Sequence, residues 1–259
     1  MTLTDRKQLA LAKRIVVKVG SSSITGENEQ KLPVLVDALA QAHQRGAEII
    51  LVTSGAIATA LPLFGLNSRP VELAGSQAMA AIGQSRLMVR YQQALDKYSI
   101  IAGQVLLTAG DFEQAETRAN AKAALDTLVS LKVLPIVNEN DTVATSEIRF
   151  GDNDRLAALV AILVEADALI LLSDIDALYT MPPELPGAQK VDYVAYGQDL
   201  SSIQVGGSSS SVGTGGAVTK IGAASTAADC SVSVLLTSAD NVAAALNGEA
   251  VGTWFQGKN

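Results

Sequence analysis

Apolar, strand-like runs and amphipathic, helix-like segments alternate along almost the whole of this chain of 259 residues. Residues 14–20 and 47–53 are largely apolar runs, and residues 31–45 between them repeat apolar side chains at the i, i+3, i+4, i+7 spacing of a helix. Apolar strands that are separated by helices are typical of a parallel sheet covered on both faces. The sequence therefore predicts an α/β fold, a three-layer αβα sandwich with a mainly parallel open sheet.

The same periodicities place the expected elements along the chain. Strands are expected at residues 14–20, 47–53, 100–107, 133–137, 168–172, 233–236 and 251–255, and helices at 31–45, 72–97, 117–131, 152–165, 217–228 and 240–246. We expect one domain over residues 1–259, with an N-terminal part up to about residue 165 and a C-terminal part over about 166–259.

Composition narrows the classes of function. The hydrophobic fraction of 48% supports a sizeable core, and the excess of 26 Asp and Glu over 19 Lys and Arg disfavours non-specific binding to nucleic acid. The single cysteine, Cys230, excludes an internal disulfide framework, and the single histidine, His43, excludes a multi-histidine metal site. We expect a buried thiol at Cys230 and a solvated His43. Charges interrupt the longest apolar stretch, residues 156–172, so we expect no membrane span and a cytoplasmic protein.

Ligands of open parallel sheets bind at the carboxyl ends of the strands, so the residues that follow each strand are the candidates for a site. Lys18 ends the first apolar run, before Gly20 and three serines. A lysine in an apolar strand either needs a partner or presents its charge to a ligand, although its ammonium group could also simply reach solvent. After the second strand, Ser54 and Gly55 suit a helix N-terminus that binds an anion, or plain helix capping by Ser54.

Three later loops carry further polar groups. Residues 138–141, Asn-Glu-Asn-Asp, suit recognition of an ammonium group or a metal, unless they form an ordinary solvated loop. Asp152, Asn153 and Asp154 open a helix, where carboxylates could hold a metal, organise lysines or complement the helix dipole. Residues 213–220, GTGGAVTK, can surround phosphates with backbone N–H groups and one cation, although a flexible Gly/Ser linker precedes them.

Together these loops resemble the amino acid kinase family, and within it the glutamate 5-kinases. The matching segments follow the order of the family: 16–20 (VVKVG), 51–57 (LVTSGAI), 83–87 (GQSRL), 103–108 (GQVLLT), 136–141 (IVNEND), 151–154 (GDND), 171–174 (LLSD) with 178–180 (LYT), and 213–220 (GTGGAVTK). Single motifs of this kind are weak, but eight in order over nearly the whole chain are specific.

The resemblance implies ATP-dependent phosphorylation of the γ-carboxylate of L-glutamate to L-glutamyl 5-phosphate, the first step of proline biosynthesis. A related kinase that acts on another acceptor, such as N-acetylglutamate, aspartate, carbamate or UMP, is the alternative within the fold. A catalytically inactive ligand-binding module is the alternative from another class, and retention of Lys18, Asp154 and Lys220 argues against it.

Roles for individual residues follow from the same resemblance. Lys18 and Lys220 are expected to contact the transferred phosphoryl group, and Asp154 to hold the two lysines. The expected glutamate site comprises Ser54, Asp141 and Asn153, with Asp152 in support. The expected ATP site comprises Lys18, Ser173, Asp174, Thr214, Gly215, Gly216, Ala217, Val218, Thr219 and Lys220. Mg²⁺ is expected to bind through the nucleotide phosphates, with no protein ligand assigned.

The resemblance also implies self-association and inhibition by proline, and this chain differs from the usual family pattern at two points. Its members usually form dimers or tetramers, and proline commonly inhibits them at the glutamate site. Many glutamate 5-kinases carry a C-terminal PUA domain, and we expect residues 1–259 to form the kinase domain without one. Ser173 stands where the family usually has threonine, a change that keeps the hydroxyl group.

Overall fold

An eight-stranded sheet forms the centre of the molecule in the computed structural model, which describes residues 2–143, 153–200, 203 and 216–259. The strand order is β3-β4-β2-β1-β5-β9-β10-β8. These strands are β1 Arg14–Lys18, β2 Glu48–Val52, β3 Ala102–Leu107, β4 Leu134–Glu139, β5 Ala168–Ser173, β8 Tyr193–Val194, β9 Ser233–Ser238 and β10 Thr253–Phe255. The short strands β6 Leu178–Tyr179 and β7 Lys190–Val191 form a separate antiparallel pair.

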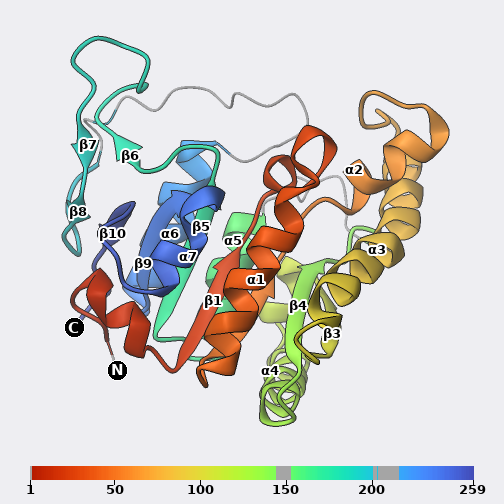
Figure 1. Cartoon of the computed structure of the whole chain (residues 1–259), viewed down its shortest axis with the longest axis horizontal. Helices are drawn as coiled ribbons and strands as arrows, with labels where there is room; N and C mark the ends of the chain where they lie inside the picture. The colour runs from red at the N-terminus through yellow and green to blue at the C-terminus, as the bar shows by residue number, and fades with distance from the viewer. Residues whose placement is uncertain (1, 144–152, 201–202, 204–215) are drawn as a thin grey trace.

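Helices cover both faces of the sheet (Figure 1). They are α1 Lys31–Gln44, α2 Ala56–Ala60, α3 Leu73–Asp96, α4 Ala115–Ser130, α5 Asn153–Leu163, α6 Ala217–Asp229 and α7 Val242–Leu246. Short 3₁₀ helices add to these, including one at Arg6–Leu11 before β1.

Successive side chains of β1 point to opposite faces of the sheet and belong to two separate apolar clusters, one on each face. Ile15 and Val17 of β1 join a cluster with residues of α1, α3 and α7 on one face. Val16 joins a second cluster with residues of α4, α5 and α6 on the other face. Successive strand residues point to opposite faces, so a strand that is apolar on both needs a helical layer on each side. The three-layer αβα sandwich predicted from the sequence is confirmed.

Strand direction defines two edges of the sheet. β1 lies at the centre, parallel to β2 on one side and to β5 on the other. β4 is parallel to β2, and β9 is parallel to β5, whereas β10 is antiparallel to β9. The carboxyl ends of β1, β2, β4, β5 and β9 therefore meet at one edge, which we call the carboxyl edge. Their starting ends form the opposite, amino edge.

The expected elements are confirmed to within a few residues at each end, and two of the differences in strand length have a visible cause. The strand expected at 133–137 continues to Glu139, because Asn138 and Glu139 stay in register with β3. The last strand, expected at 251–255, begins at Thr253, since Gly252 adopts a φ of 70° that interrupts an extended chain.

Two expectations about single residues are wrong. Cys230 is exposed rather than buried, because α6 ends at Asp229 and the chain turns there through Ser231, whose φ is 65°. His43 is half-buried rather than solvated, and burial lowers its pKa. No helix in the described part of the chain is both long and apolar enough to cross a membrane.

Candidate active site

Two lysines share one buried aspartate at the carboxyl edge. Lys18 Nζ lies 2.6 Å from Asp154 Oδ1, and Lys220 Nζ lies 3.0 Å from Asp154 Oδ2. The last residue of β1 supplies Lys18, and the first turns of α5 and α6 supply Asp154 and Lys220. All three side chains are buried, Asp154 most completely at 1% exposure. Buried ammonium groups need a partner, and here one carboxylate serves two of them.

The charges of this cluster do not cancel. Burial alone would raise the pKa of Asp154, but the nearby Lys18 and Lys220 outweigh it and lower that pKa to about 2. Asp154 is therefore ionised at neutral pH and is no proton acceptor. Two ammonium groups against one carboxylate leave a surplus positive charge, which favours an anionic ligand such as a phosphoryl group.

The start of α6 adds polar groups to the same cluster. Thr219 Oγ1 lies 2.9 Å from Asp154 Oδ2 and 2.9 Å from the backbone oxygen of Gly216, which caps the helix. Ala217 and Val218 occupy the first turn, and the Val218 side chain is exposed. The backbone N–H groups of such a first turn have no partner within the helix and suit binding of phosphate.

The glycine turn after β1 approaches the end of β5. Ser22 Oγ donates to Asp174 Oδ1 over 2.9 Å, and Ser173 is the last residue of β5. A Cβ atom at Gly20 would lie 3.7 Å from Lys18 Nζ, so glycine at this position leaves the lysine more open to a ligand.

Asn153 links the lysine cluster to the end of β2. Its Nδ2 atom lies 2.8 Å from Thr53 O, 2.9 Å from Ser54 Oγ and 2.9 Å from Asn138 Oδ1. Its Oδ1 atom is buried and has no hydrogen-bond partner among the described residues. A buried acceptor without a partner is costly, so a ligand donor at this atom would be favourable.

A chain of amide side chains runs on from Asn153. Asn138 Nδ2 donates to Gln84 Oε1 over 2.7 Å, and Gln84 Nε2 donates to Gln104 Oε1 over 3.2 Å. The backbone N–H of Glu139 donates to Asn138 Oδ1, which fixes the orientation of that amide because a backbone N–H cannot accept. The hydrogen bonds of the chain therefore have one direction, from Asn153 through to the glutamines.

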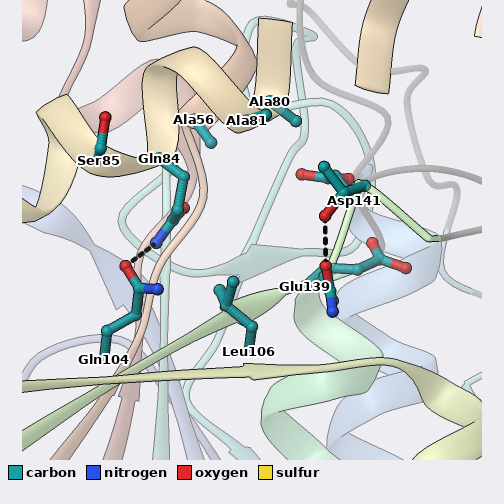
Figure 2. A pocket seen from close by; sticks show the side chains of 11 residues that line it. Ala56, Ala80, Ala81, Gln84, Ser85, Gln104, Leu106, Glu139 and Asp141 are labelled. Carbon is teal, nitrogen blue, oxygen red and sulfur yellow. Dashed lines mark hydrogen bonds between the residues drawn. The ribbon is translucent and has the colours of Figure 1, made fainter. Parts of the chain in front are cut away.

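The glutamines lie in the wall of a cavity of about 230 Å³ between α3 and the carboxyl ends of β3 and β4. Figure 2 shows Gln84 and Gln104 on one side of this cavity and Glu139 and Asp141 on the other. Ala56, Ala80, Ala81, Ser85, Leu106, Asn140 and Thr142 complete its lining. The cavity thus has a mixed lining of apolar and polar residues, and Glu139 and Asp141 make one wall acidic.

Close packing of two helices shapes this cavity. A Cβ atom at Gly83 of α3 would lie 1.8 Å from the backbone oxygen of Ala56 in α2, so only glycine fits there. Gly55 is the N-cap of α2 and has a φ of 106°, a conformation that glycine adopts without strain. These two glycines let the segment after β2 bring Ala56 against α3 and into the cavity wall.

The acidic wall has unusual electrostatics. Burial and the neighbouring Glu139 raise the pKa of Asp141 to about 6, and Arg69 partly opposes this increase. Glu139 is also buried. It is the last residue of β4, a strand that was expected to stop at Val137. Two carboxylates that disfavour each other's charge would both gain from a cationic ligand group such as an ammonium.

The structure brings together most residues predicted from the sequence. Lys18, Asp154, Lys220 and Thr219 form one cluster, Asn153 and Ser54 are hydrogen-bonded beside it, and Asp141 lies in the cavity wall. Asp152, Thr214 and Gly215 lie outside the described residues. Sequence analysis named Glu139 only as part of the polar segment 138–141, and it did not single out Gln84 and Gln104 as site residues. The segments 83–87 and 103–108, which resemble family motifs, contained the signal for the two glutamines.

Comparison with known proteins identifies related sequences. Residues 13–238 match the model of the Amino acid kinase family. "Glutamate 5-kinase" of Clavibacter sepedonicus is 60% identical over 255 residues, which cover 98% of each chain. "Glutamate 5-kinase" of Leifsonia xyli subsp. xyli is 59% identical, covering 98% of this chain and 95% of that one. The Bifidobacterium longum protein of the same name is 51% identical, covering 96% of this chain and 68% of its own.

Solved structures share the fold at low identity. Carbamate kinase from Giardia lamblia bound to AMP-PNP aligns with a TM-score of 0.69 at 16% identity. The alignment covers 96% of this chain and 100% of the carbamate kinase chain. An isopentenyl phosphate kinase aligns with a TM-score of 0.65 at 18% identity, covering 94% of this chain and 100% of its own. Identities this low support the fold and say nothing further about the substrate.

Proposed function

The chain belongs to the amino acid kinase family, and from this premise we propose that it transfers the γ-phosphoryl group of ATP to the γ-carboxylate of L-glutamate. The product would be L-glutamyl 5-phosphate, the first intermediate of proline biosynthesis. One observation carries the proposal: two buried lysines share Asp154, and an amide chain connects this cluster to a cavity with an acidic wall. The relatives named above, which match nearly the whole chain, support the same activity.

The reaction needs charge stabilisation rather than a base. A carboxylate with a pKa near ~4.3 is already ionised at neutral pH, so no proton has to be removed from the acceptor. The obstacle is the approach of one anion to another, and fixed cations at the transferred group lower that barrier. We assign this role to Lys18 and Lys220, and we assign to Asp154 the task of holding both lysines in place.

The cavity at the carboxyl ends of β3 and β4 is the proposed glutamate site. Asp141 would bind the α-ammonium group, and the unpartnered Oδ1 of Asn153 could accept a hydrogen bond from the substrate. Ser54 is held by Asn153, and we propose that Asp152 supports the same site. The γ-carboxylate would then point from the cavity toward the lysine cluster.

ATP is proposed to bind at the C-terminal part of the chain. The first turn of α6 with the preceding residues 213–216 would surround the phosphates, and Ser173 and Asp174 at the end of β5 would contact the rest of the nucleotide. The described residues contain no group of three or more His, Cys, Asp or Glu that could hold a metal, and Asp154 is engaged by lysines. As the resemblance implies, we propose that Mg²⁺ arrives on the phosphates of ATP, where it would neutralise part of their charge.

The wider setting follows the family expectations. We propose that the chain acts in the cytoplasm, where ATP and L-glutamate are available, as a dimer or tetramer, and that proline inhibits it by competing with glutamate. The acidic wall argues against two of the alternative acceptors within the fold, N-acetylglutamate and UMP. An acylated amine, as in N-acetylglutamate, carries no positive charge for Asp141, and a nucleotide monophosphate would be repelled.

The test is an acceptor panel with hydroxylamine present, which traps an acyl phosphate as a coloured hydroxamate. ADP release is measured with Mg-ATP and, in turn, L-glutamate, N-acetylglutamate, aspartate and UMP. The proposal predicts ADP and matching hydroxamate with L-glutamate above all the others. Preference for another acceptor would reassign the substrate, and no turnover by folded protein with any of them would favour a binding module.

A further inference from the structure

Thr219 contacts the lysine cluster from the first turn of α6. The resemblance to a family places this residue in the ATP site, and a backbone N–H in such a first turn suits a phosphate. Its hydroxyl group has other contacts, because Oγ1 lies 2.9 Å from Asp154 Oδ2 and 2.9 Å from the backbone oxygen of Gly216. The role of the side chain is therefore separate from that of the backbone.

The contact with Gly216 alone would be an ordinary feature of a helix. Hydroxyl groups in helices commonly donate to a backbone oxygen three or four residues earlier. Thr226 of the same helix does this, since its Oγ1 donates to Gly222 O over 2.9 Å, and Thr226 is exposed. Thr219 differs from it because the carboxylate of Asp154 is an additional acceptor.

The single proton of the Thr219 hydroxyl group favours this carboxylate. Asp154 is ionised, and a hydrogen bond to an ionised acceptor is about twice as strong as one between neutral groups. The competing acceptor, Gly216 O, also accepts from the backbone N–H of Lys220 over 3.3 Å. Gly216 therefore keeps a donor when Thr219 donates to Asp154.

Two adjacent residues of α6 thereby hold one oxygen of Asp154. Lys220 Nζ lies 3.0 Å from Oδ2, the atom that accepts from Thr219, whereas Lys18 Nζ lies 2.6 Å from Oδ1. Partial rotation of the carboxylate about its Cβ–Cγ bond would move both oxygens away from their lysines. A third donor on Oδ2 opposes that rotation.

The third donor is neutral, and this matters when an anion binds. A phosphoryl group at the cluster would attract both ammonium groups away from Asp154, and it would have no comparable attraction for a hydroxyl group. Thr219 can therefore hold Asp154 while the lysines contact the phosphoryl group, and it adds no charge to the cluster. Small displacements of groups that contact the reacting atoms lower the rate strongly.

Resting on the role proposed above for the two lysines, we propose that Thr219 is a positioning residue for phosphoryl transfer. Its hydroxyl group holds Asp154, and Asp154 in turn holds Lys18 and Lys220 beside the transferred group. Two explanations compete with this one. The hydroxyl group could serve only the helix, as at Thr226, or it could contact the nucleotide directly.

Variants that keep or remove the hydroxyl group separate these explanations. Thr219→Val replaces it with a methyl group of similar size, Thr219→Ala is a second variant without a hydroxyl group, and Thr219→Ser keeps the donor. Thr226→Val removes a contact of the same length from the same helix and is the matched control. kcat and KM for ATP are measured at saturation with the best acceptor of the panel, and urea unfolding gives the stability of each variant.

We expect Thr219→Val and Thr219→Ala to lower kcat by about tenfold and to change KM for ATP by less than about twofold. Thr219→Ser should restore most of the lost kcat, and Thr226→Val should leave both constants unchanged. A higher KM for ATP with unchanged kcat would overturn the inference in favour of direct contact with the nucleotide. An unchanged kcat in both variants without the hydroxyl group, or an equal loss in Thr219→Ser, would overturn it as well.

Folding and the choice of acceptor give the remaining outcomes. If Thr219→Val and Thr219→Ala both fail to fold while Thr219→Ser folds, the hydroxyl group has a structural role and the inference is wrong. The expected pattern of kcat with an acceptor other than L-glutamate would uphold the role of Thr219 and refute the proposed substrate. No turnover of any acceptor by the folded, unmodified chain would overturn both proposals.

Discussion

The two ends of strand β1 both carry a largely buried cation, and their surroundings differ. At the amino edge, Arg14 Nε lies 2.7 Å from Glu48 Oε2, and Arg14 Nη1 lies 2.7 Å from Asp126 Oδ1 and 2.7 Å from Val164 O. At the carboxyl edge, Lys18 must share the single carboxylate of Asp154 with Lys220. Arg14 thus contacts two carboxylates and a backbone oxygen by itself, whereas Lys18 and Lys220 contact the same carboxylate.

This difference separates stability from function. The cation at the amino edge is bound by three acceptors within the fold, so its contacts are expected to contribute to the free energy of unfolding. At the carboxyl edge, two buried ammonium groups contact one carboxylate, an arrangement that suits an anionic reactant. Variants at the two ends of β1 should therefore affect different observables.

The largest expected effect is on turnover. Lys18→Ala or Lys220→Ala should each lower kcat by roughly 10²–10³, as expected when one charge-stabilising donor is removed. Steady-state kinetics at saturating ATP and L-glutamate, with circular dichroism to verify folding, measures this. If kcat stayed unchanged in both variants, the lysines would lose their assigned role.

At the other end of β1 the effect should be on stability. Arg14→Ala removes contacts with Glu48, Asp126 and Val164, so the free energy of unfolding should fall by about 2–4 kcal/mol. Urea unfolding measures this change, and kcat below the unfolding transition should stay within about twofold.

Lys13→Ala is the control for that result, because the Lys13 side chain is 80% exposed and lies 3.9 Å from Glu48. It should change stability by less than ~0.5 kcal/mol. A loss of turnover in folded Arg14→Ala, comparable to that of the lysine variants, would break the distinction between the two edges.

A smaller effect is expected in the cavity. Asp141→Asn should raise KM for L-glutamate by about tenfold or more, with a smaller change in KM for ATP, because the neutral amide no longer attracts the α-ammonium group. Initial rates over a matrix of both substrate concentrations give the two constants. A change confined to KM for ATP would remove Asp141 from the amino acid site.

The smallest predicted effect is a dependence on pH. Since the pKa of Asp141 is raised to about 6, its ionised form, which binds an ammonium group, is lost as the pH falls through that value. KM for L-glutamate at pH 5 should be about tenfold higher than at pH 7. Asp154, whose pKa is lowered to about 2, stays ionised over this range. The same increase in Asp141→Asn would point to another titrating group.

Local sequence patterns predicted much of the fold because the core of a parallel sheet consists of local apolar runs. The ends of β1, β2 and β5 and the first turns of α5 and α6 lie close to where periodicity placed them. Since parallel strands bring their carboxyl ends together, residues as distant in sequence as Lys18, Asp154 and Lys220 were expected at one edge, and the resemblance to a family supplied their roles.

Other parts of the site depend on packing that no local pattern encodes. Gln84 lies in the middle of the long helix α3, and its partners Asn138 and Gln104 depend on how α3 sits against β3 and β4. The amino-edge network joins Arg14 to residues 34 and 112 positions away, and no local pattern indicated that pairing. The extension of β4 to Glu139 similarly follows from pairing with β3.

The central claim is that surplus positive charge at the carboxyl edge drives phosphoryl transfer to the γ-carboxylate of glutamate. The most direct test measures hydroxamate formed per ADP released, with L-glutamate, by the unmodified chain and by folded Lys220→Ala. We predict about one hydroxamate per ADP for the unmodified chain and, for Lys220→Ala, both rates lower by roughly 10²–10³. ADP release without hydroxamate, or equal rates in the two proteins, would contradict the account.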